Sequence, residues 1–359
     1  MNKDLHGGNI YKFQRKGKNN ILDYSSNINP LGVPQKFIDI AKENFDKLVN
    51  YPDPYYIELR KKIAEFNSLN IDNVIVGNGA TEILFLYIRA LKPKKVLILA
   101  PCFAEYERAL KSVSANIEYF ELKESDNFYP NIINLKKEIE NNNYDLLLLC
   151  NPNNPTGQFI KLEDIKEIVK TCENKNTKIF IDEAFIEFIE NWKEKTVSLL
   201  KNKNIFIMRA FTKFFAIPGL RLGYGIGFDD EILKKMWEEK EPWTVNTFAN
   251  LAGLIMLDDK EYIEKSEKWI LEEKKFMYKE LSEFQYIKAY KTECNFILIK
   301  IYNTSSASLR DKMIEKNILI RDASNFKFLD YHFVRLAIKD RKSNLKMMET
   351  LAEFVEYRG

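Results

Sequence analysis

The stretch A-F-T-K-F-F-A-I-P-G-L-R-L-G-Y, residues Ala210–Tyr224, follows an apolar run, Ile205–Met208, that has the composition of a buried strand. It places one lysine, Lys213, just past the end of that strand. Thr212 supplies a hydroxyl beside the lysine, and Arg221 supplies a cation eight residues later. Such a cation can bind a cofactor's phosphate and lower the pKa of the lysine. The segment therefore suits an amine that forms a Schiff base with an aldehyde cofactor.

Apolar runs alternate with helical patterns around this stretch, from about residue 73 to residue 227. The runs predicted as strands are Asn73–Val76, Val96–Ala100, Ile117–Phe120, Leu146–Cys150, Lys178–Ile181, Ile205–Met208 and Tyr224–Ile226. The helical patterns between many of them are Thr81–Leu91, Glu105–Ser112, Asn134–Asn141 and Leu162–Glu173. Strands that are covered on both faces are apolar throughout, so the alternation predicts an α/β fold with a mostly parallel, seven-stranded sheet.

The pattern changes after about residue 240, where we expect a smaller α+β domain. It begins with a long, charged helical region, Thr247–Phe284. The later elements expected are the strands Asn295–Ile301, Ile318–Arg321 and Phe333–Ile338 and the helices Ser306–Glu315 and Ser343–Tyr357. The predicted organisation is an arm over residues 1–45 that packs with the small domain, a large cofactor-binding domain over 46–240 and a small domain over 241–359.

The composition argues against several classes of protein, among them nucleic-acid-binding and membrane proteins. The chain has 359 residues, 45% hydrophobic and 30% charged, with a net charge of +3, so it gives no reason to expect a nucleic-acid partner. Four cysteines without a metal or C-x-x-C spacing indicate a reducing compartment. No apolar run approaches the ~20 residues of a membrane span, and the N-terminus lacks a signal peptide's apolar core. We expect a cytoplasmic protein with no membrane partner, and two histidines make a metal site or a Ser-His-Asp triad unexpected.

One motif is typical of a phosphate cradle. Residues Gly77–Glu82, G-N-G-A-T-E, follow a predicted strand and begin a helix. Glycine at Gly79 lets the backbone approach an anion, and the helix N-terminus at Ala80 and Thr81 offers unpaired N–H groups. The motif is neither G-x-G-x-x-G nor a Walker loop, and a plain turn capped by Thr81 is the alternative.

Two further polar residues stand at strand ends. Asn154 lies in N-P-N-N-P-T-G, a rigid loop at a strand's carboxyl end, and can donate to a ring hydroxyl; a solvent-exposed turn is the alternative. Asp182, in I-D-E-A-F, is a carboxylate whose burial is costly unless it is paired. A protonated ring nitrogen would justify it, whereas the alternative is a helix N-cap. Glu183 beside it is interpreted as structural.

Two aromatic residues are candidates for contact with a ring or a phosphate. Phe103, just past a strand, can stack on a flat ring, with Tyr106 as its substitute, or pack in the core. Tyr51, in Y-P-D-P, can reach a phosphate across a dimer interface or simply belong to a turn.

Two arginines stand at strand ends in the predicted small domain. Arg321, in I-L-I-R-D, and Arg335, in F-V-R-L, suit two-pronged binding of a carboxylate or phosphate, although either could form a surface ion pair. Two such residues on neighbouring strands indicate a substrate with two anionic groups.

Taken together, the motifs G-x-G-A-T, N-P-x-N-P-T-G, D-E-A-F, T-K and R-x-G-Y occur in one order. In this the chain resembles the fold-type I pyridoxal 5'-phosphate (PLP) enzymes, the aspartate-aminotransferase superfamily, over nearly its whole length. The resemblance implies that Lys213 is the Schiff-base lysine, that Asp182 pairs with the pyridine nitrogen and that Asn154 donates to ring O3′. It implies phosphate contacts from Gly79, Ala80, Thr81, Thr212, Arg221 and, from the second subunit of a homodimer, Tyr51.

The same resemblance implies that Phe103 stacks on the cofactor and that Arg335 binds the substrate's α-carboxylate. The chain departs from the family at Phe185, where the family often has a tyrosine whose hydroxyl donates to ring O3′.

Within the superfamily the chain is similar to the L-threonine-O-3-phosphate decarboxylases in H-G-G-N-I-Y, L-D-Y-S-S-N-I-N-P-L-G and D-E-A-F-I-E-F. This implies decarboxylation of L-threonine O-3-phosphate to (R)-1-aminopropan-2-yl phosphate and CO2, for the nucleotide loop of cobalamin. His6, Asn27 and Arg321 would then bind the substrate phosphate. The next resemblance, to histidinol-phosphate aminotransferases, implies amino transfer on a phosphorylated amino acid instead. A third reading is a cofactor-binding protein without catalysis.

Overall fold

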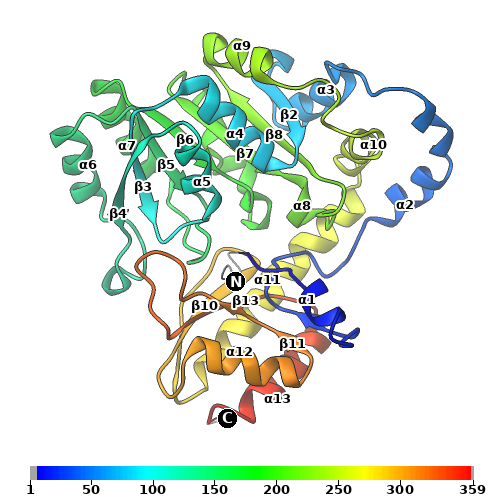
Figure 1. Cartoon of the computed structure of the whole chain (residues 1–359), viewed down its shortest axis with the longest axis vertical. Coiled ribbons are helices and arrows are strands. Elements are labelled where there is room, and N and C mark those ends of the chain that lie inside the picture. The colour runs from blue at the N-terminus through cyan, green and yellow to red at the C-terminus, as the bar shows by residue number, and fades with distance from the viewer. Residues whose placement is uncertain (1–5, 357–359) are drawn as a thin grey trace.

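The computed structural model describes residues 6–356 and shows a large α/β lobe above a smaller lobe (Figure 1). The first described residues lie where the two lobes meet, and the last described residues lie on the small lobe. In the span from residue 6 to residue 356, the helices are too short or too polar to cross a membrane.

The large lobe is built on one seven-stranded sheet. Its strands are β2 (Val74–Asn78), β3 (Lys95–Ala100), β4 (Asn116–Glu121), β5 (Leu146–Cys150), β6 (Lys178–Asp182), β7 (Ile205–Ala210) and β8 (Leu222–Gly227). The strand order is β2-β8-β7-β6-β5-β3-β4. Strand β8 runs antiparallel to both of its neighbours, and the remaining neighbours are parallel. The predicted α/β class and mostly parallel seven-stranded sheet are confirmed.

The central strands of this sheet are buried on both faces, which explains why runs such as β5 are apolar throughout, whereas the edge strand β4 is partly exposed and mixed in composition. In β5, Leu147 and Leu149 belong to one core cluster, whereas Leu146 and Leu148 belong to a second cluster on the opposite face. Successive strand side chains point to opposite faces, so covering both faces requires apolar residues at every position. The helices of this lobe are α2 (Gln35–Lys42), α3 (Ile57–Phe66), α4 (Ala80–Leu91), α5 (Glu105–Lys111), α6 (Ile132–Asn141), α7 (Leu162–Asn174), α8 (Phe211–Phe214), α9 (Asp230–Glu239) and α10 (Thr247–Met256).

The small lobe has a four-stranded antiparallel sheet of order β12-β13-β10-β9. Its strands are β9 (Ile287–Ala289), β10 (Phe296–Ile301), β12 (Arg321–Asp322) and β13 (Phe333–Ala337). Its helices are α11 (Lys260–Ser282), α12 (Ser306–Glu315) and α13 (Arg341–Ala352). Short 3-10 turns are η1 (Phe45–Val49), η2 (Ile71–Asn73), η3 (Glu124–Asp126), η4 (Ile186–Phe188), η5 (Trp192–Glu194) and η6 (Val197–Leu200).

Three expectations for this region were wrong in detail. The single helical region expected over Thr247–Phe284 is two helices, because Asp259 caps a new start by accepting the N–H of Tyr262. The strand expected over Ile318–Arg321 divides into two two-residue strands in different sheets. The last helix begins two residues early, at Arg341, after its N-cap Asp340, and the expected end at Tyr357 lies outside the described residues.

The N-terminal arm is fastened to the small lobe. It carries the short helix α1 (Tyr11–Gln14) and strand β1 (Leu22–Asp23), which pairs in parallel with β11 (Ile318–Leu319). The hydroxyl of Tyr24 donates to Asn344 Oδ1 of α13, 2.9 Å away. The arm therefore forms part of the surface that the small lobe turns toward the large sheet. The domain boundaries at residues 45 and 240 stay a prediction.

Candidate active site

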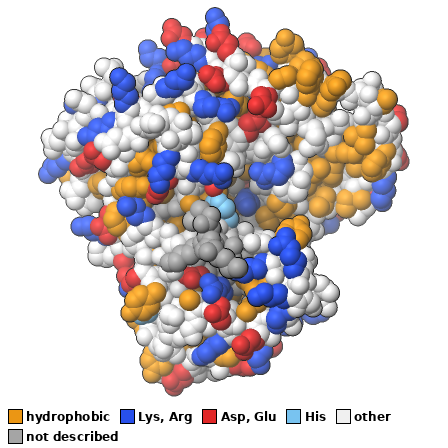
Figure 2. Space-filling view, in the orientation of Figure 1, with side chains coloured by type: hydrophobic (Ala, Val, Ile, Leu, Met, Phe, Trp, Pro, Cys, Tyr) orange, Lys and Arg blue, Asp and Glu red, His pale blue; other side chains and the backbone are white. Residues whose placement is uncertain are grey.

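A cavity of about 430 Å³ lies against the carboxyl ends of β5, β6 and β7 and is closed on its other side by the arm and the small lobe. Figure 2 shows a histidine where the two lobes meet, with Lys and Arg side chains on both sides of it. The predicted site residues that line this cavity are His6, Asn27, Ala80, Thr81, Phe103, Asn154, Asp182, Thr212, Lys213, Arg221, Arg321 and Arg335.

Two predicted residues do not line the cavity. Gly79 lies just behind it, next to Ala80. Tyr51 is 80% exposed, and its ring lies against Trp243 with the centroids 4.8 Å apart. Within one chain Tyr51 is therefore on the outer surface.

Lys213 is positioned by the turn from β7 into α8. Burial, followed by the charges of the nearby guanidinium groups of Arg335 and Arg221, lowers the pKa of its amine to about 8. An amine with such a pKa is partly uncharged near neutral pH. It can therefore act as a nucleophile or exchange a proton.

Asp182 is the last residue of β6, and each of its oxygens accepts one hydrogen bond. Oδ1 accepts from the N–H of Ala184 at 2.9 Å, and Oδ2 accepts from the hydroxyl of Tyr106 at 2.5 Å. Burial raises the pKa of the Asp182 carboxyl to about 6, while these two bonds act in the opposite direction. A cation placed in the cavity beside this carboxylate would offset its desolvation.

The predicted phosphate cradle has the expected backbone. Gly79 has a φ of 77°, and a Cβ there would lie 2.4 Å from Nη2 of Arg221. A Cβ on Gly223 would lie 2.3 Å from the backbone nitrogen of Ala80. The N-cap of α4 is Gly79, without a side-chain cap, so the alternative of Thr81 as the cap is wrong. The open helix N-terminus and the guanidinium together suit an anion.

Arg335 is deeply buried and links three parts of the site. Its Nη1 donates to Asn154 Oδ1 and its Nη2 donates to the backbone oxygen of Ser25, both at 2.6 Å. Its buried Nε makes no hydrogen bond. Burial, followed by the charge of Arg321, lowers the pKa of Arg335 to about 9. The alternative of a surface ion pair is therefore wrong for Arg335.

Arg321 lies beside Arg335 on the neighbouring strand, in register with it. Its Nη1 donates to the backbone oxygen of Asp322 and its Nη2 donates to Asn325 Oδ1, both at 2.8 Å. Its guanidinium lies over the ring of Phe326, 5.2 Å from the centroid. These contacts hold the guanidinium at the cavity, so the two arginines present a strongly cationic wall.

The arm also lines the cavity, on the side of the small lobe. His6 Nε2 lies 2.8 Å from Glu105 Oε1, and its ring centroid lies 5.4 Å from that of Phe103. Asn27 is buried, and its side-chain Oδ1 has no hydrogen-bond partner. An unpartnered amide oxygen at a cavity can accept a hydrogen bond from a ligand or a water.

Sequence reasoning missed several lining residues, namely Gly7, Ser25, Ser26, Leu84, Glu105, Arg108, Cys150, Ala184, Met208, Ala210 and Phe326. Phe185 was noted only as a departure from the family. Many of these side chains are of types that occur throughout the chain. Ser25 and Ser26 directly precede the predicted Asn27 in the sequence, and that position is a signal that could have pointed to these two residues. Tyr106, the substitute for the stacking aromatic, lies behind Phe103 and bonds to Asp182.

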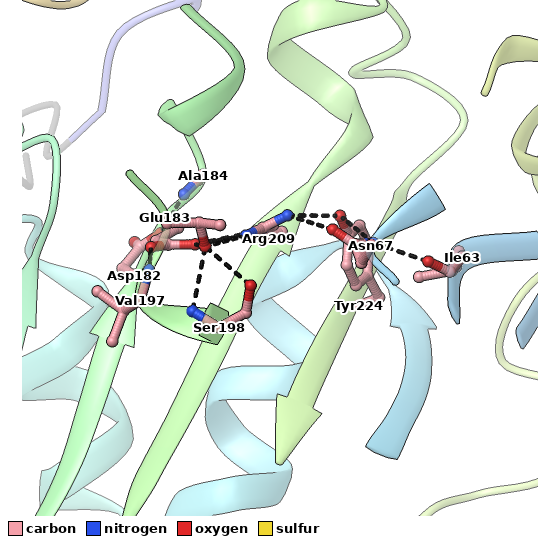
Figure 3. A network of polar contacts seen from close by, with 10 residues as sticks. Ile63, Asn67, Asp182, Glu183, Ala184, Val197, Ser198, Arg209 and Tyr224 are labelled. Carbon is pink, nitrogen blue, oxygen red and sulfur yellow. Dashed lines mark hydrogen bonds and ion pairs between the residues drawn. The ribbon is translucent and has the colours of Figure 1, made fainter. Parts of the chain in front are cut away.

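A second buried polar network lies directly behind the site (Figure 3). Glu183 Oε2 accepts from Arg209 Nε at 3.0 Å and from Arg209 Nη2 at 2.7 Å, and both side chains are fully buried. The other end of Arg209 donates to Asn67 Oδ1 at 2.5 Å and to the hydroxyl of Tyr224 at 3.5 Å. This network joins β6, β7, β8 and α3, and the interpretation of Glu183 as structural fits it.

The part of the chain that the structure describes has no group of three or more His, Cys, Asp or Glu side chains that could hold a metal ion. The polar side chains of the cavity are instead cations, two buried carboxylates (Asp182 and Glu105), amides and hydroxyls. Such a set binds anions and a ring cation.

Comparisons with known proteins agree with this geometry. The model of the family described as aminotransferase class I and II matches residues 19–351. A protein named "Putative threonine-phosphate decarboxylase", from Caldanaerobacter subterraneus subsp. tengcongensis, is 44% identical over 98% of this chain and 94% of its own length. Threonine-phosphate decarboxylase from Salmonella typhimurium is 33% identical over 96% of this chain and 95% of its own length.

A crystal structure gives the same result. The histidinol-phosphate aminotransferase from Clostridium acetobutylicum superposes on this chain with a TM-score of 0.87 and is 38% identical. The match covers 93% of this chain and 98% of that one. From the sheet, the cavity at its strand ends and these similarities together, the chain belongs to the aminotransferase class I and II family.

Proposed function

We propose that this protein is a PLP-dependent carboxy-lyase that converts L-threonine O-3-phosphate to (R)-1-aminopropan-2-yl phosphate and CO2. The observation that carries the proposal is the pairing of a phosphate cradle near Lys213 with a second cationic wall at Arg321 and Arg335. One set of cations suits a cofactor phosphate, and the other suits a substrate with two anionic groups. The names of the 44% and 33% identical relatives support the same reaction.

The residues of the cavity fit PLP. Gly79, Ala80 and Thr81 would hold its phosphate together with Thr212 and Arg221, and a side chain at Gly79 would fill that space. Phe103 would stack on the ring, Asp182 would pair with the ring nitrogen and Asn154 would donate to ring O3′, since its Oδ1 is already bonded to Arg335. When bound, PLP supplies an aldehyde for the substrate amine and a ring that accepts the electron pair released at Cα.

Arg335 is proposed to bind the substrate's α-carboxylate, and Arg321, His6 and Asn27 to bind its phosphate. The Nε of Arg335 and the Oδ1 of Asn27 are buried without partners, so a ligand that pairs with them removes a desolvation cost. Anchoring both ends of the substrate fixes the rotation about Cα. That rotation decides which bond at Cα is broken, so the two anchors would select loss of the carboxylate over loss of the Cα proton.

Lys213 is proposed to return the proton after CO2 leaves. The bond that breaks joins Cα to the carboxyl carbon, and the bond that forms joins Cα to a proton from Lys213 or from a water. With a pKa of about 8, Lys213 carries a proton that it can donate near neutral pH. The product then enters the nucleotide loop of cobalamin, the context that the sequence resemblance implies.

Product analysis tests the proposal. Purified protein with PLP and L-threonine O-3-phosphate is expected to release CO2 and aminopropanol phosphate without any 2-oxo acid. The Lys213→Ala variant is the matched control and is expected to release neither. Transfer of the amino group to 2-oxoglutarate with no CO2 would overturn the lyase.

That outcome would support the second candidate, an aminotransferase for a phosphorylated amino acid such as histidinol phosphate. The 38% identity to a histidinol-phosphate aminotransferase favours it. Incubation with histidinol phosphate and 2-oxoglutarate, followed by measurement of glutamate, separates the two candidates.

We also propose that the protein is a homodimer with shared active sites. Figure 2 shows hydrophobic side chains gathered on the side of the large lobe where α2 and α10 lie in Figure 1. Exposed apolar residues of that region are Leu31, Val33, Phe45, Leu48, Val49, Tyr51, Tyr55, Ile57 and Trp243. A surface of this kind is typical of a permanent interface, and a second copy would bring Tyr51 to the neighbouring cradle.

Sedimentation tests the dimer. Val49→Asp, at an 85% exposed position, is expected to yield monomers with weakened PLP binding. Ile133→Asp, at an exposed apolar position on α6, is the matched control and is expected to stay dimeric. A wild-type protein that sediments as a monomer would contradict the proposal.

A cytoplasmic location is proposed on the cysteines. All four are free and buried, and no disulfide forms among them. Thiols in this state are typical of a reducing compartment.

A further inference from the structure

Tyr106 lies directly behind the candidate active site. It is on α5, its side chain is fully buried, and its hydroxyl donates to Asp182 Oδ2 at 2.5 Å. Asp182 lines the cavity, whereas Tyr106 does not. Any effect of Tyr106 on a bound ligand must therefore pass through another residue.

The hydroxyl of Tyr106 gives the second oxygen of the Asp182 carboxylate its hydrogen bond. The N–H of Ala184 bonds Oδ1 from the residue's own loop, and Tyr106 bonds Oδ2 from a helix on one face of the sheet. The ring of Tyr106 lies edge-to-face against that of Phe103, with the centroids 5.7 Å apart at an angle of 83°. Helix α5 and the residues just before it therefore fix both Phe103, the proposed stacking aromatic, and the plane of the Asp182 carboxylate.

The charged and titratable groups around Asp182 explain why this donor matters. Lys213 faces it from α8, Cys150 from β5, where the two residues are in register, and Glu183 follows it in the chain. Burial and Glu183 disfavour the ionised carboxylate, whereas Tyr106 and Lys213 favour it. Lys213 acts on the carboxylate through its charge, whereas Tyr106 is the side chain that donates a hydrogen bond to it.

Tyr106 is suited to be such a donor. Burial, together with the charge of Asp182, raises the pKa of its phenol well above the usual value, so the hydroxyl keeps its proton. A hydrogen bond from a neutral donor to a carboxylate stabilises the ionised form.

We propose that Tyr106 is a positioning residue that fixes the plane of the Asp182 carboxylate and keeps it ionised toward the cofactor's ring nitrogen. This inference rests on the proposed function, because it assigns Asp182 to that nitrogen. Tyr106 itself touches neither substrate nor cofactor.

Tyr106→Phe removes one hydroxyl and leaves the ring contact with Phe103 in place. The chain offers a matched control, because Tyr129 donates to Asp164 Oδ2 at the same 2.5 Å, away from the cavity. In the cofactor-free protein, the carboxyl ¹³C signal of Asp182, assigned with Asp182→Asn, follows its titration. We expect its midpoint to rise by about one pH unit or more in Tyr106→Phe, and to stay at the wild-type value in Tyr129→Phe.

Cofactor binding provides the second readout. Tyr106→Phe is expected to weaken PLP binding about tenfold at pH 7, with a larger loss at pH 6, where more of the carboxyl is protonated. Adding the same substitution to Asp182→Asn is expected to cause no further loss, because the hydroxyl acts only through the carboxylate. A purely structural role for Tyr106 would instead weaken binding equally in both backgrounds.

An unchanged midpoint and unchanged PLP affinity in Tyr106→Phe would overturn the inference. So would equal losses with and without the Asp182 carboxylate. A wild-type protein that binds no PLP, or that binds it and releases no CO2, refutes the proposed function instead. The ¹³C titration of the cofactor-free protein distinguishes these cases, since it needs neither ligand nor turnover.

Discussion

Asp182 and Glu183 are consecutive residues at the end of one strand, yet their surroundings differ. Glu183 is enclosed by Arg209, Thr196 and the N–H of Val197. Burial lowers the pKa of Arg209, but Tyr224 and Glu183 outweigh it and raise that pKa above the usual range. Asp182 faces a cavity whose surroundings disfavour the charged forms of its cations, because burial lowers the pKa of Lys213 and of Arg335. Glu183 is paired with an opposite charge, whereas Asp182 and Arg335 form their hydrogen bonds with neutral groups, which leaves their charges available to a ligand.

Lys213→Ala gives the largest expected effect. Turnover is expected to fall at least about 10³-fold, because the amine that captures the aldehyde and moves the proton is lost. Borohydride treatment followed by peptide mapping is expected to find no pyridoxyl label at position 213 in this variant and to find one there in the wild type. Lys213→Arg, which keeps the charge, is the control and is expected to be equally inactive. Full turnover in the alanine variant would refute the site assignment.

Arg209→Met tests the enclosed side of the comparison. It leaves the fully buried Glu183 without its cation, so the free energy of unfolding is expected to fall by about 3–5 kcal/mol. Urea unfolding at pH 7 measures the loss. Arg209→Met combined with Glu183→Met is the control and is expected to recover part of it. A loss below about 1 kcal/mol would show that the two networks do not differ as described.

Arg335→Met tests the cavity side of the comparison. Its effect on the free energy of unfolding is expected to have the opposite sign to that of Arg209→Met. The pKa of Arg335, about 9, lies below the usual value, so folding disfavours its charged form at neutral pH. The cofactor-free variant is therefore expected to be as stable as the wild type or more stable. Its kcat/KM for L-threonine O-3-phosphate is expected to fall about 10²-fold. Destabilisation as large as that of Arg209→Met would remove the distinction.

The pH dependence of cofactor capture gives the smallest effect. Only the neutral amine of Lys213 reacts, so the capture rate is expected to rise with pH and to level off above about 8. The Arg335→Met variant is expected to move this midpoint upward, because it removes a neighbouring positive charge. Stopped-flow absorbance measures the rate, and an unmoved midpoint would show that Arg335 does not act on Lys213.

The same shift affects stability. The folded pKa of Lys213, about 8, lies below its ordinary value of 10.5, so the unfolded chain binds more protons between these values. This group's destabilising contribution is therefore fully present below pH 8 and fades as the pH rises toward 10.5.

The sheet and the strand-end residues could be predicted from sequence because each is a local signal. A run such as Leu146–Cys150 is apolar throughout only where both faces are covered, and the residue after it must then stand at the sheet's edge. This signal predicts Lys213, Asp182 and Asn154 as site residues, and all three line the cavity. Their chemistry is unusual at a buried strand end, which made them conspicuous.

What the sequence could not predict depends on contacts between distant segments. Ser25 and Glu105 reach one cavity from positions far apart in the chain, and neither residue type is distinctive. Strands β1 and β11 have two residues each, too few to show any periodicity. The break before α11 contains no Pro or Gly and depends on a single Asp cap.

The pairing of Leu22–Asp23 with Ile318–Leu319 has a consequence for how the protein is made. On the ribosome, the first of these strands emerges nearly three hundred residues before its partner exists. The part of the pocket that carries His6 and Asn27 therefore cannot form until residues 318–319 have been made, whereas the large sheet can assemble earlier. A nascent chain stalled before residue 318 would have a formed sheet and an incomplete pocket. The proposed substrate-binding residues of the arm would therefore reach their places after the sheet has formed.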